Sequence, residues 1–307
     1  MLEMRGANRI LVASANNADP DGVRLAFKAG ADPRILLVPG EDGVTPMHRL
    51  ITMGAKDTAV SALAEGGADM DLEIRDPWGR TLLHRTAILG QALIAEALLE
   101  KGADPDAEDP GTGGTALHLC ALNRSWQAGI ALAMHDADPG IKDREGSTPL
   151  HWIAVPMHRK AERGLYNPAG LVGWLEVLLE RGADVDIPDA NGRTPLQVAA
   201  RNGNEPVVES LLYHGADANR TDAEGRTALL QGLLNNHPRV TELLVQHGAD
   251  PGIADQQGTT VLDRLNFIQA AWGVDLAEQV RRAAAREAAR SSSRAGTSRS
   301  PERGPSL

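Results

Sequence analysis

The 307-residue sequence contains a single cysteine, Cys120. One thiol excludes an intramolecular disulfide and any metal site made of several cysteines, and it suits a reducing compartment. No apolar run approaches the roughly 18 residues that a membrane-spanning helix needs, and residues 1–18 show no apolar segment behind basic residues. We therefore expect a cytoplasmic protein without a membrane span, and delivery into a host cell without a cleavable signal peptide stays open.

The signatures of familiar catalytic sites are also missing. The sequence has no GxSxG, HExxH or CxxC pattern, so nucleophilic and metal-assisted catalysis have no support in it. The glycines of residues 111–114 have no lysine in P-loop spacing and no strand before them, which indicates a permissive turn. We predict a protein that is not an enzyme, with no cofactor and no metal.

Positive charge is scarce over most of the chain. The 31 Lys and Arg residues face 41 Asp and Glu residues, which gives a net charge of -10. From Arg281 onward seven arginines face only Glu287 and Glu302, a local charge of +5, so the preceding residues carry -15. An acidic body repels phosphate backbones, and we therefore expect no nucleic acid partner.

The sequence does contain a repeat with two markers. An Ala-Asp pair and a threonine recur in separate phases, both at intervals of 33 to 37 residues with one longer interval of 46. Two markers that keep one period indicate a repeat architecture. The aspartates are Asp32, Asp69, Asp104, Asp138, Asp184, Asp217 and Asp250, and the threonines are Thr45, Thr81, Thr115, Thr148, Thr194, Thr227 and Thr260.

Each repeat encodes a turn and two short helices. In the repeat that begins at Asp189, the turn formers of residues 189–192 indicate a tight hairpin-like turn. Thr194 is the N-cap of a first helix that ends at Gly203, and a second helix opens after Pro206. Helices of about nine residues are not stable alone in water, so each pair must bury its apolar faces against its neighbours. The sequence therefore predicts a stacked solenoid.

Several motifs give this repeat a family resemblance. GSTPLH at Gly146–His151, GRTPLQVAARNG at Gly192–Gly203 and the serial GAD loops resemble the ankyrin repeat family, in roughly seven copies over Arg9–Arg282. The resemblance implies an all-α fold of helix-turn-helix repeats with short β-hairpin finger loops. It also implies inner helices that line a concave groove, outer helices on the convex side, and protein binding. It does not imply an enzymatic activity.

The repeat pattern suggests three regions. Residues 1–40 should form an N-terminal capping repeat that lacks the TPLH element and keeps the outer helix. Residues 41–290 should form the array, which ends in a capping helix over Val274–Arg290. Residues 291–307, of Ser, Arg, Gly and Pro without aromatic residues, should be a disordered basic tail. In the capping repeat, the residues expected to face the next repeat are Leu11, Leu25 and Phe27.

The fourth repeat carries 13 additional residues at about 156–168. This insertion falls between the two helices and brings several basic residues to an acidic body. It is either a tolerated surface loop or a functional element, and both interpretations stay open. We include Arg159 and Tyr166 from it among the candidate binding residues.

Four histidines, His48, His84, His118 and His151, hold the same place in successive repeats. Repeats stacked about 10 Å apart cannot bring them to one metal ion. The resemblance implies a structural role, with each ring bonded to backbone near the adjacent finger.

The candidate binding residues come from the family's geometry, in which finger tips and the last turn of each inner helix face the groove. Trp78 is either an interface anchor or packed against its neighbouring finger, whereas Trp126 and Trp174 should lie in the core. Beside Arg159 and Tyr166, the candidates are Trp78, Arg80, Leu122, Asn123, Arg144, Glu145, Asn191, Arg193, Arg201, Asn202, Glu224, Arg226, Leu234 and Asn235.

These observations favour a monomeric, non-catalytic module that binds a protein partner on the concave and finger face, as an adaptor, scaffold or inhibitor. The alternative is a microbial effector or regulatory subunit that recruits or controls an enzyme through the insertion. An enzyme would require a closed pocket with converging polar groups. The sequence does not specify the partner.

Overall fold

The computed structural model describes residues 2–65, 71–155, 168–264 and 274–296. The chain divides into two compact units. Unit 1 comprises Met1–Ile153 and Met157–Asp184, and unit 2 comprises Ala154–Pro156 and Val185–Leu307. Nearly all of the predicted insertion, with Arg159 and Tyr166, lies outside the described residues, as does most of the predicted tail.

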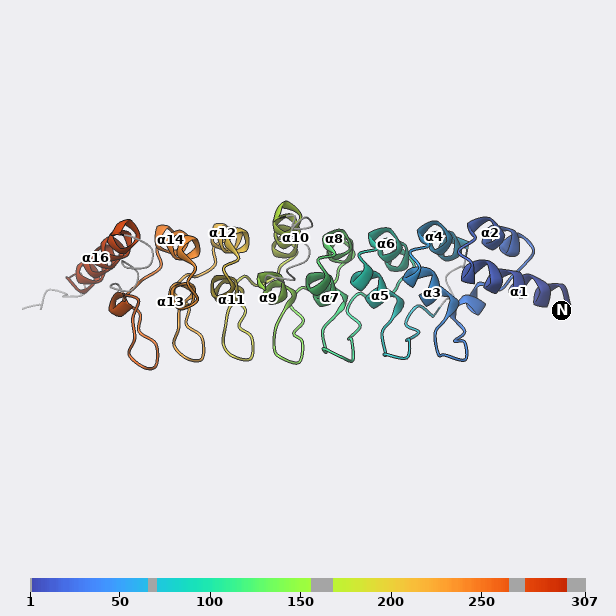
Figure 1. Ribbon diagram of the computed structural model, residues 1–307, viewed down its shortest axis with the longest axis horizontal. Coiled ribbons are helices and arrows are strands. Elements are labelled where there is room, and N and C mark those ends of the chain that lie inside the picture. The colour runs from blue at the N-terminus through green and yellow to red at the C-terminus, as the bar shows by residue number, and fades with distance from the viewer. Residues whose placement is uncertain (1, 66–70, 156–167, 265–273, 297–307) are drawn as a thin grey trace, which may run out of the picture. The chain divides into compact units, whose positions relative to one another are not determined.

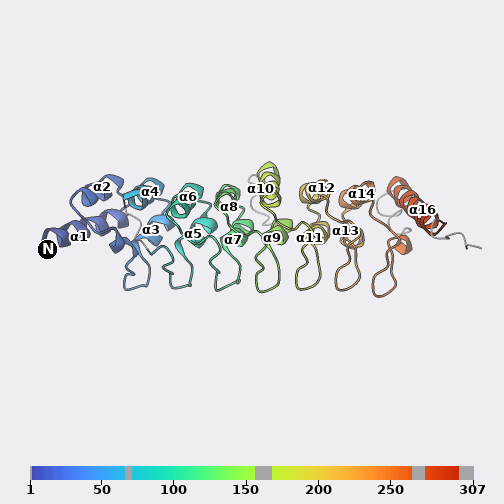
Figure 2. The ribbon, with the colours of Figure 1, turned by 180° about the vertical axis from the view of Figure 1, so that it is seen from behind.

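Unit 1 is a double row of helices (Figure 1). Inner helices α1, α3, α5 and α7 pack side by side, and outer helices α2, α4, α6, α8 and α10 form the second row. Figure 2 shows from behind that the finger loops project from the inner row, away from the outer row. The elements are α1 Leu2–Asn16, α2 Pro20–Lys28, the 3-10 helix η1 Pro33–Leu37, α3 Pro46–Thr52, α4 Lys56–Glu65, α5 Leu82–Leu89, α6 Ala92–Glu100, α7 Ala116–Asn123, α8 Trp126–Met134, α9 Pro149–Ala154 and α10 Pro168–Glu180.

Unit 2 repeats the same packing. Inner helix α11 packs against α13, and the outer helices α12, α14 and α16 contact one another in that order. The elements are α11 Pro195–Asn202, α12 Glu205–Tyr213, α13 Ala228–Leu234, α14 Pro238–Gln246, the 3-10 helix η2 Leu262–Arg264 and α16 Val274–Gly296. The last helix therefore ends beyond Arg290, where the sequence placed its end.

The threonine marker is the N-cap of the inner helices, as predicted. The Thr194 hydroxyl accepts the N–H of Gln197 at 3.3 Å, and the Gln197 side-chain oxygen accepts the N–H of Thr194 at 2.8 Å. This reciprocal pair is a capping box, and it satisfies two backbone donors that the first helical turn leaves unpaired. Gly203, at φ 69°, ends the helix in the left-handed conformation.

His84, His118 and His151 accept the N–H of their repeat threonine at Nδ1, and His48 Nδ1 lies 2.8 Å from the Thr45 hydroxyl. The predicted bond to the backbone of the adjacent finger is present for His48 and His118. Thr115 donates its N–H to Nδ1 of His118 at 2.9 Å, and His118 Nε2 lies 3.0 Å from the carbonyl oxygen of Ser147 in the next finger. Because Nδ1 accepts, the ring proton is on Nε2 and the imidazole is neutral. Burial lowers the pKa of His48 and His118 and lowers that of His84 to about 4.

The finger loops are turns, and the predicted β-hairpin strands are not confirmed, because the described residues contain no strand. Two backbone bonds close the fifth finger, from Asp189 N–H to Arg193 O at 2.9 Å and from Gly192 N–H to Asp189 O at 3.0 Å. Neighbouring fingers are joined by backbone bonds between residues 32 positions apart, such as Ala223 N–H to Asn191 O at 3.0 Å.

The tryptophans of the outer helices confirm the predicted core. Trp174 is fully buried and Trp126 is 9% exposed, with ring centroids 5.9 Å apart. Trp174 can lie this deep because Gly129 of α8 has no side chain at the contact.

The N-terminal repeat differs from the prediction in two respects. It is a complete pair, because α1 packs against both α2 and α3 where only an outer helix was expected. Leu11 is buried as predicted, but Leu25 is 63% exposed, because it lies on the face of α2 opposite the buried Val23 and Ala26. At the junction after α8, Asp136 takes the left-handed φ of 62° that glycine takes in other repeats.

Replacing His84 with Gln should reduce the acid sensitivity of the fold. The ring's pKa falls from 6.5 to about 4 on folding because burial disfavours its charged form. Its contribution to stability is therefore complete above pH 6.5 and is lost as pH falls toward 4, a change of about 3 kcal/mol. Gln, which caps Thr194 at the same repeat position, does not titrate. Urea titrations above and below this window measure the difference.

The matched control is His84→Ala, which removes the capping partner of Thr81 and should lower the unfolding free energy at both pH values. The prediction is wrong if the wild type and His84→Gln lose the same stability on acidification.

Gly129→Ala should destabilise unit 1 although alanine is the better helix former. A Cβ at Gly129 would lie 2.4 Å from Cε2 of Trp174, and overpacking of this kind costs about 1–3 kcal/mol. Gly173 on α10 is the control, since a Cβ there meets nothing within 4 Å. Gly173→Ala should therefore raise the unfolding free energy by about 0.5–1 kcal/mol, because alanine is the better helix former. Thermal unfolding that shifts in the same direction for both variants would contradict this packing.

Candidate binding surface

Five finger loops of the described residues are each organised by one aspartate near the base. One carboxylate oxygen of Asp76 accepts the N–H groups of Trp78 and Arg80, both at 2.9 Å. The aspartates at the equivalent positions, Asp143, Asp189, Asp222 and Asp255, accept the N–H groups two and four residues later in the same way. Such bonds fix the loop conformation before any partner arrives.

The second carboxylate oxygen is held by an arginine in several fingers. Arg193 bonds to Asp189 at 2.9 Å and Arg226 to Asp222 at 3.2 Å. Arg80 reaches Asp109 of the next finger at 2.8 Å. The carboxylates of these three aspartates are only 1% exposed, so three of the predicted binding arginines neutralise buried charges inside the array.

These bonds outweigh burial in setting the charge of the carboxylates. Burial raises the pKa of Asp109, but the hydrogen bonds from Arg80 and Thr112 hold it below its ordinary value. Burial likewise raises the pKa of Asp189, but the bonds from Arg193 oppose it and the pKa lies below its ordinary value. Both carboxylates are therefore ionised at neutral pH, and each requires its arginine.

The finger tips present a smaller set of available side chains. Trp78 is 62% exposed, with the Arg85 guanidinium carbon 4.7 Å from its ring centroid. Glu145, Asn191 and Glu224 are exposed, and Glu224 pairs with Arg226. Arg144 is exposed but donates to the carbonyl oxygens of Pro110 and Gly111 in the preceding finger, at 2.7 and 3.3 Å.

The last turns of the inner helices carry both helix-capping and exposed residues. Asn123, Asn202 and Asn235 each donate the side-chain amide to the carbonyl four residues earlier, at 2.8, 2.8 and 2.9 Å. Leu234 is 48% exposed, Arg201 is exposed and Leu122 is half-buried.

Two residues that the sequence did not single out belong to the same surface. Met53 is 54% exposed and Leu89 is 45% exposed, at the ends of α3 and α5. Both lie eight residues after a repeat threonine, the position that Asn123 holds in the third repeat. Alignment of the repeats on this threonine was the signal that could have found them.

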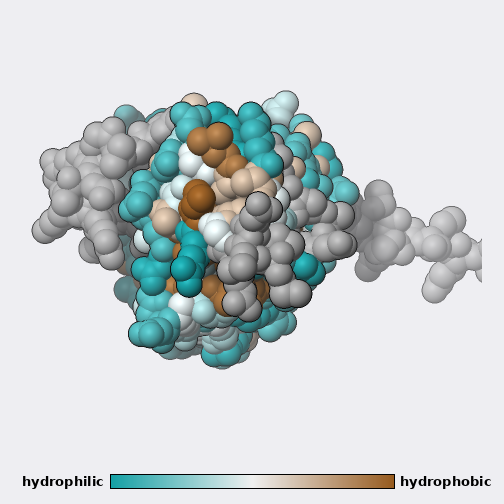
Figure 3. All heavy atoms as spheres, turned by 90° about the vertical axis from the view of Figure 1, so that its right-hand side faces the viewer, coloured by the Kyte–Doolittle hydropathy of each residue, from teal (hydrophilic) through white to brown (hydrophobic). Residues whose placement is uncertain are grey.

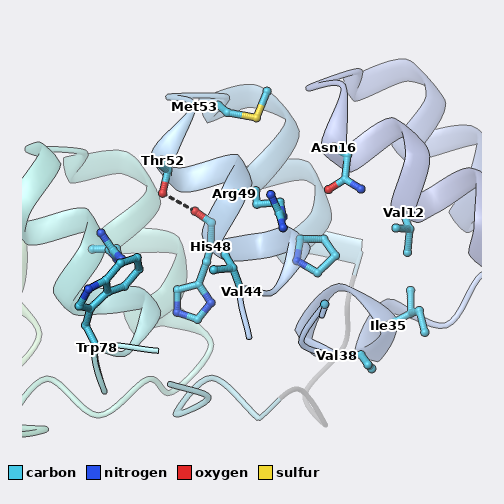
Figure 4. A pocket seen from close by; sticks show the side chains of 13 residues that line it. Val12, Asn16, Ile35, Val38, Val44, His48, Arg49, Thr52, Met53 and Trp78 are labelled. Atoms are coloured by element: carbon cyan, nitrogen blue, oxygen red, sulfur yellow. Dashed lines mark hydrogen bonds between the residues drawn. The ribbon is translucent and has the colours of Figure 1, made fainter. Parts of the chain in front are cut away.

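A groove opens at the N-terminal part of unit 1, with a volume of about 800 Å³. We call it the N-terminal groove. Figure 4 shows Trp78 on one side of it and Val12, Ile35 and Val38 on the other, with His48 and Val44 between them. Figure 3, which faces the N-terminal end of unit 1, shows hydrophobic residues among hydrophilic ones. The apolar residues that line the groove include Val12, Ile35, Val38, Val44, Met53 and Trp78.

The charged residues of the N-terminal groove already have partners. Arg49 pairs with Asp42, and Arg85 pairs with the buried Asp76 at 2.6 Å. Burial lowers the pKa of His48, so its ring is neutral at pH 7. The described lining residues therefore carry no unpaired charge.

The described part of the chain lacks two further features, a cluster of metal-ligating side chains and a membrane-spanning helix. Within it, no group of three or more His, Cys, Asp or Glu side chains is arranged to hold a metal ion. None of the helices described is long and apolar enough to cross a membrane.

A family model described as ankyrin repeats (3 copies) matches residues 10–109 and 157–255. The chain belongs to the ankyrin repeat family. It is 31% identical over 182 residues to the B-cell lymphoma 3 protein homolog of Mus musculus, covering 59% of this chain and 37% of that protein. It is 32% identical over 133 residues to the mouse NF-kappa-B inhibitor delta, covering 41% of this chain and 39% of that protein. The ankyrin chain thus spans well under half the length of these relatives.

Among solved ankyrin structures, the crystal structure of the ankyrin repeat domain of Bcl-3 is similar to this chain. The TM-score is 0.63 at 28% sequence identity, and the match covers 78% of this chain and all of that domain. The Bcl-3 structure is described as that of a unique member of the IkappaB protein family.

Arg193→Ala should destabilise the fifth ankyrin repeat by about 1–3 kcal/mol, because the buried Asp189 carboxylate loses a charged partner. Asn191→Ala, two residues away at the exposed tip, should change stability by less than about 0.5 kcal/mol. Urea unfolding measures both. Equal stability of the two variants would mean that Arg193 is available for binding after all.

Proposed function

We propose that this ankyrin repeat chain binds another protein through the finger tips and the exposed ends of its inner helices. The observation that carries the proposal is the half-exposed apolar side chain at the end of α3, α5 and α13. Met53, Leu89 and Leu234 expose 54%, 45% and 48% of their surface in helices whose other apolar residues are mostly buried. Exposed apolar residues in the last turns of the inner helices, with Trp78 lining the same groove as Met53, are typical of an interaction site.

The charge and the family support a protein as the partner. A net charge of -10 disfavours nucleic acid, and two finger arginines, Arg193 and Arg226, are paired with buried carboxylates. The name NF-kappa-B inhibitor delta describes one relative as an inhibitor, and we propose an adaptor, scaffold or inhibitor role without catalysis for this chain. We place this function in the cytoplasm, where the buried, unpaired Cys120 stays reduced.

The proposal predicts which face contacts the partner. A photo-crosslinking amino acid at Leu89 or Leu234 should capture the same protein from a cell lysate. The same group at Leu93 on α6 or Tyr213 on α12, which are 49% and 84% exposed on outer helices, should not. All four positions are exposed, so the substitutions should preserve the helical circular dichroism signal. Mass spectrometry of the adducts identifies the protein and the crosslinked residue.

Equal capture from inner and outer positions would overturn the assignment of the face. Capture from the outer positions alone would place the binding surface on the outer helices.

A further inference from the structure

The N-terminal groove is apolar and exposed at the same time. Val38, Met53 and Trp78 expose 53%, 54% and 62% of their surface, although they line one concavity with buried residues such as Leu36 and Met47 beneath its walls. Three large apolar side chains that stay in water around one concavity favour burial by a ligand.

The walls of the groove are held by hydrogen bonds. Gly40 and Val44 are joined by a backbone bond of 3.0 Å, and the Thr45 hydroxyl lies 2.8 Å from His48 Nδ1. On the opposite wall, the Trp78 N–H is bonded to Asp76 at 2.9 Å. A site whose backbone is fixed before binding loses little conformational entropy when a ligand enters.

Charge complementarity indicates what kind of ligand fits. The Arg49 guanidinium already pairs with Asp42, and Arg85 with Asp76, so a carboxylate in the ligand would compete with existing pairs. A cation would have to stack on an indole that already has Arg85 on one face. Either charge would lose water without gaining a partner, whereas an uncharged apolar group would not.

Polar groups at the rim suit a polypeptide. The Asn16 amide lines the groove beside its apolar residues (Figure 4). So do the Thr52 hydroxyl, whose oxygen can accept a bond while it donates to the His48 carbonyl oxygen at 2.7 Å, and the Arg49 guanidinium, which also pairs with Asp42. A peptide needs such groups, because its backbone donors and acceptors must be paired when its side chains are buried.

We propose that the N-terminal groove binds an uncharged apolar segment of a partner protein, with an aliphatic or aromatic side chain of that segment against the open face of Trp78. This inference rests on the proposed protein-binding function and specifies its partner chemistry. The segment enters between η1 and the finger that carries Trp78, with its backbone toward the rim.

Three pools of short synthetic peptides test the proposal. The pools share Leu and Phe at their centres and differ only in flanking residues, which are Gly and Ser, Asp and Glu, or Lys and Arg. The probe is the indole Nε1–H resonance of Trp78, assigned with Trp78→Phe. The neutral pool should shift this resonance and leave those of the buried Trp126 and Trp174 unchanged.

Variants locate the contact within the groove. Isothermal titration calorimetry measures the variants, because Trp78→Ala removes the resonance used as the probe. Trp78→Ala and Met53→Ser should each weaken binding of the neutral pool by about tenfold or more, since exposed anchor residues dominate such interfaces. Leu93→Ser removes an apolar side chain of similar exposure, 49%, outside the groove and should leave binding unchanged. Circular dichroism verifies that all three variants fold.

Results with the charged peptide pools, or with the protein alone, could contradict the proposal. Tighter binding of the acidic or basic pool, or no shift with any pool, would overturn the proposal. A Trp78 shift that grows with protein concentration without peptide would mean that a second copy of the chain occupies the groove.

If crosslinking at Leu89 captures a protein but the neutral peptides do not bind, this inference is wrong and the proposed function stands. If the peptides bind but no inner position crosslinks, the proposed function is wrong instead.

Discussion

The length of the helices constrains this structure most strongly. The helices from α2 to α14 have 6 to 13 residues, which is near or below the limit at which a helix is stable alone. Each therefore depends on its neighbours in the row, as α5 does on α3 and α7. The contact of Trp174 with Trp126 and Gly129 shows how close this packing becomes. Many residues at the ends of the inner helices and at the finger tips are not required for it, and the candidate binding surface consists of such residues.

Polar residues, like the apolar ones, are mostly engaged in contacts within the array. Finger aspartates such as Asp189 bond the backbone of their own finger, and His118 caps its own helix and reaches the next finger. Arginines that the sequence made available for binding, such as Arg193, neutralise these carboxylates. The charged residues near the fingers are thus largely internal partners, and the surface left for recognition is more apolar than the composition suggests.

The sequence predicted the parts of the fold that depend on local chemistry. The threonine caps, the glycine ends of helices and the buried tryptophans were all correct because each follows from residue type and period. The exposure of Leu25 and the groove beside Trp78 were missed. The groove depends on η1, which the repeat pattern did not predict, and on residues of three repeats that line it together. Periodicity identifies which residues recur, but it does not show which side chains are already engaged.

The backbone bonds between fingers have a consequence for how such a chain can change over generations. Each bond joins residues 32 positions apart, as in Ala223 to Asn191, so a finger is tied only to the one beside it. Recombination between neighbouring gene segments can add or delete a whole repeat, and the flanking fingers then meet a neighbour of the same chemistry. The recognition surface can thereby lengthen or shorten while every remaining repeat keeps its fold.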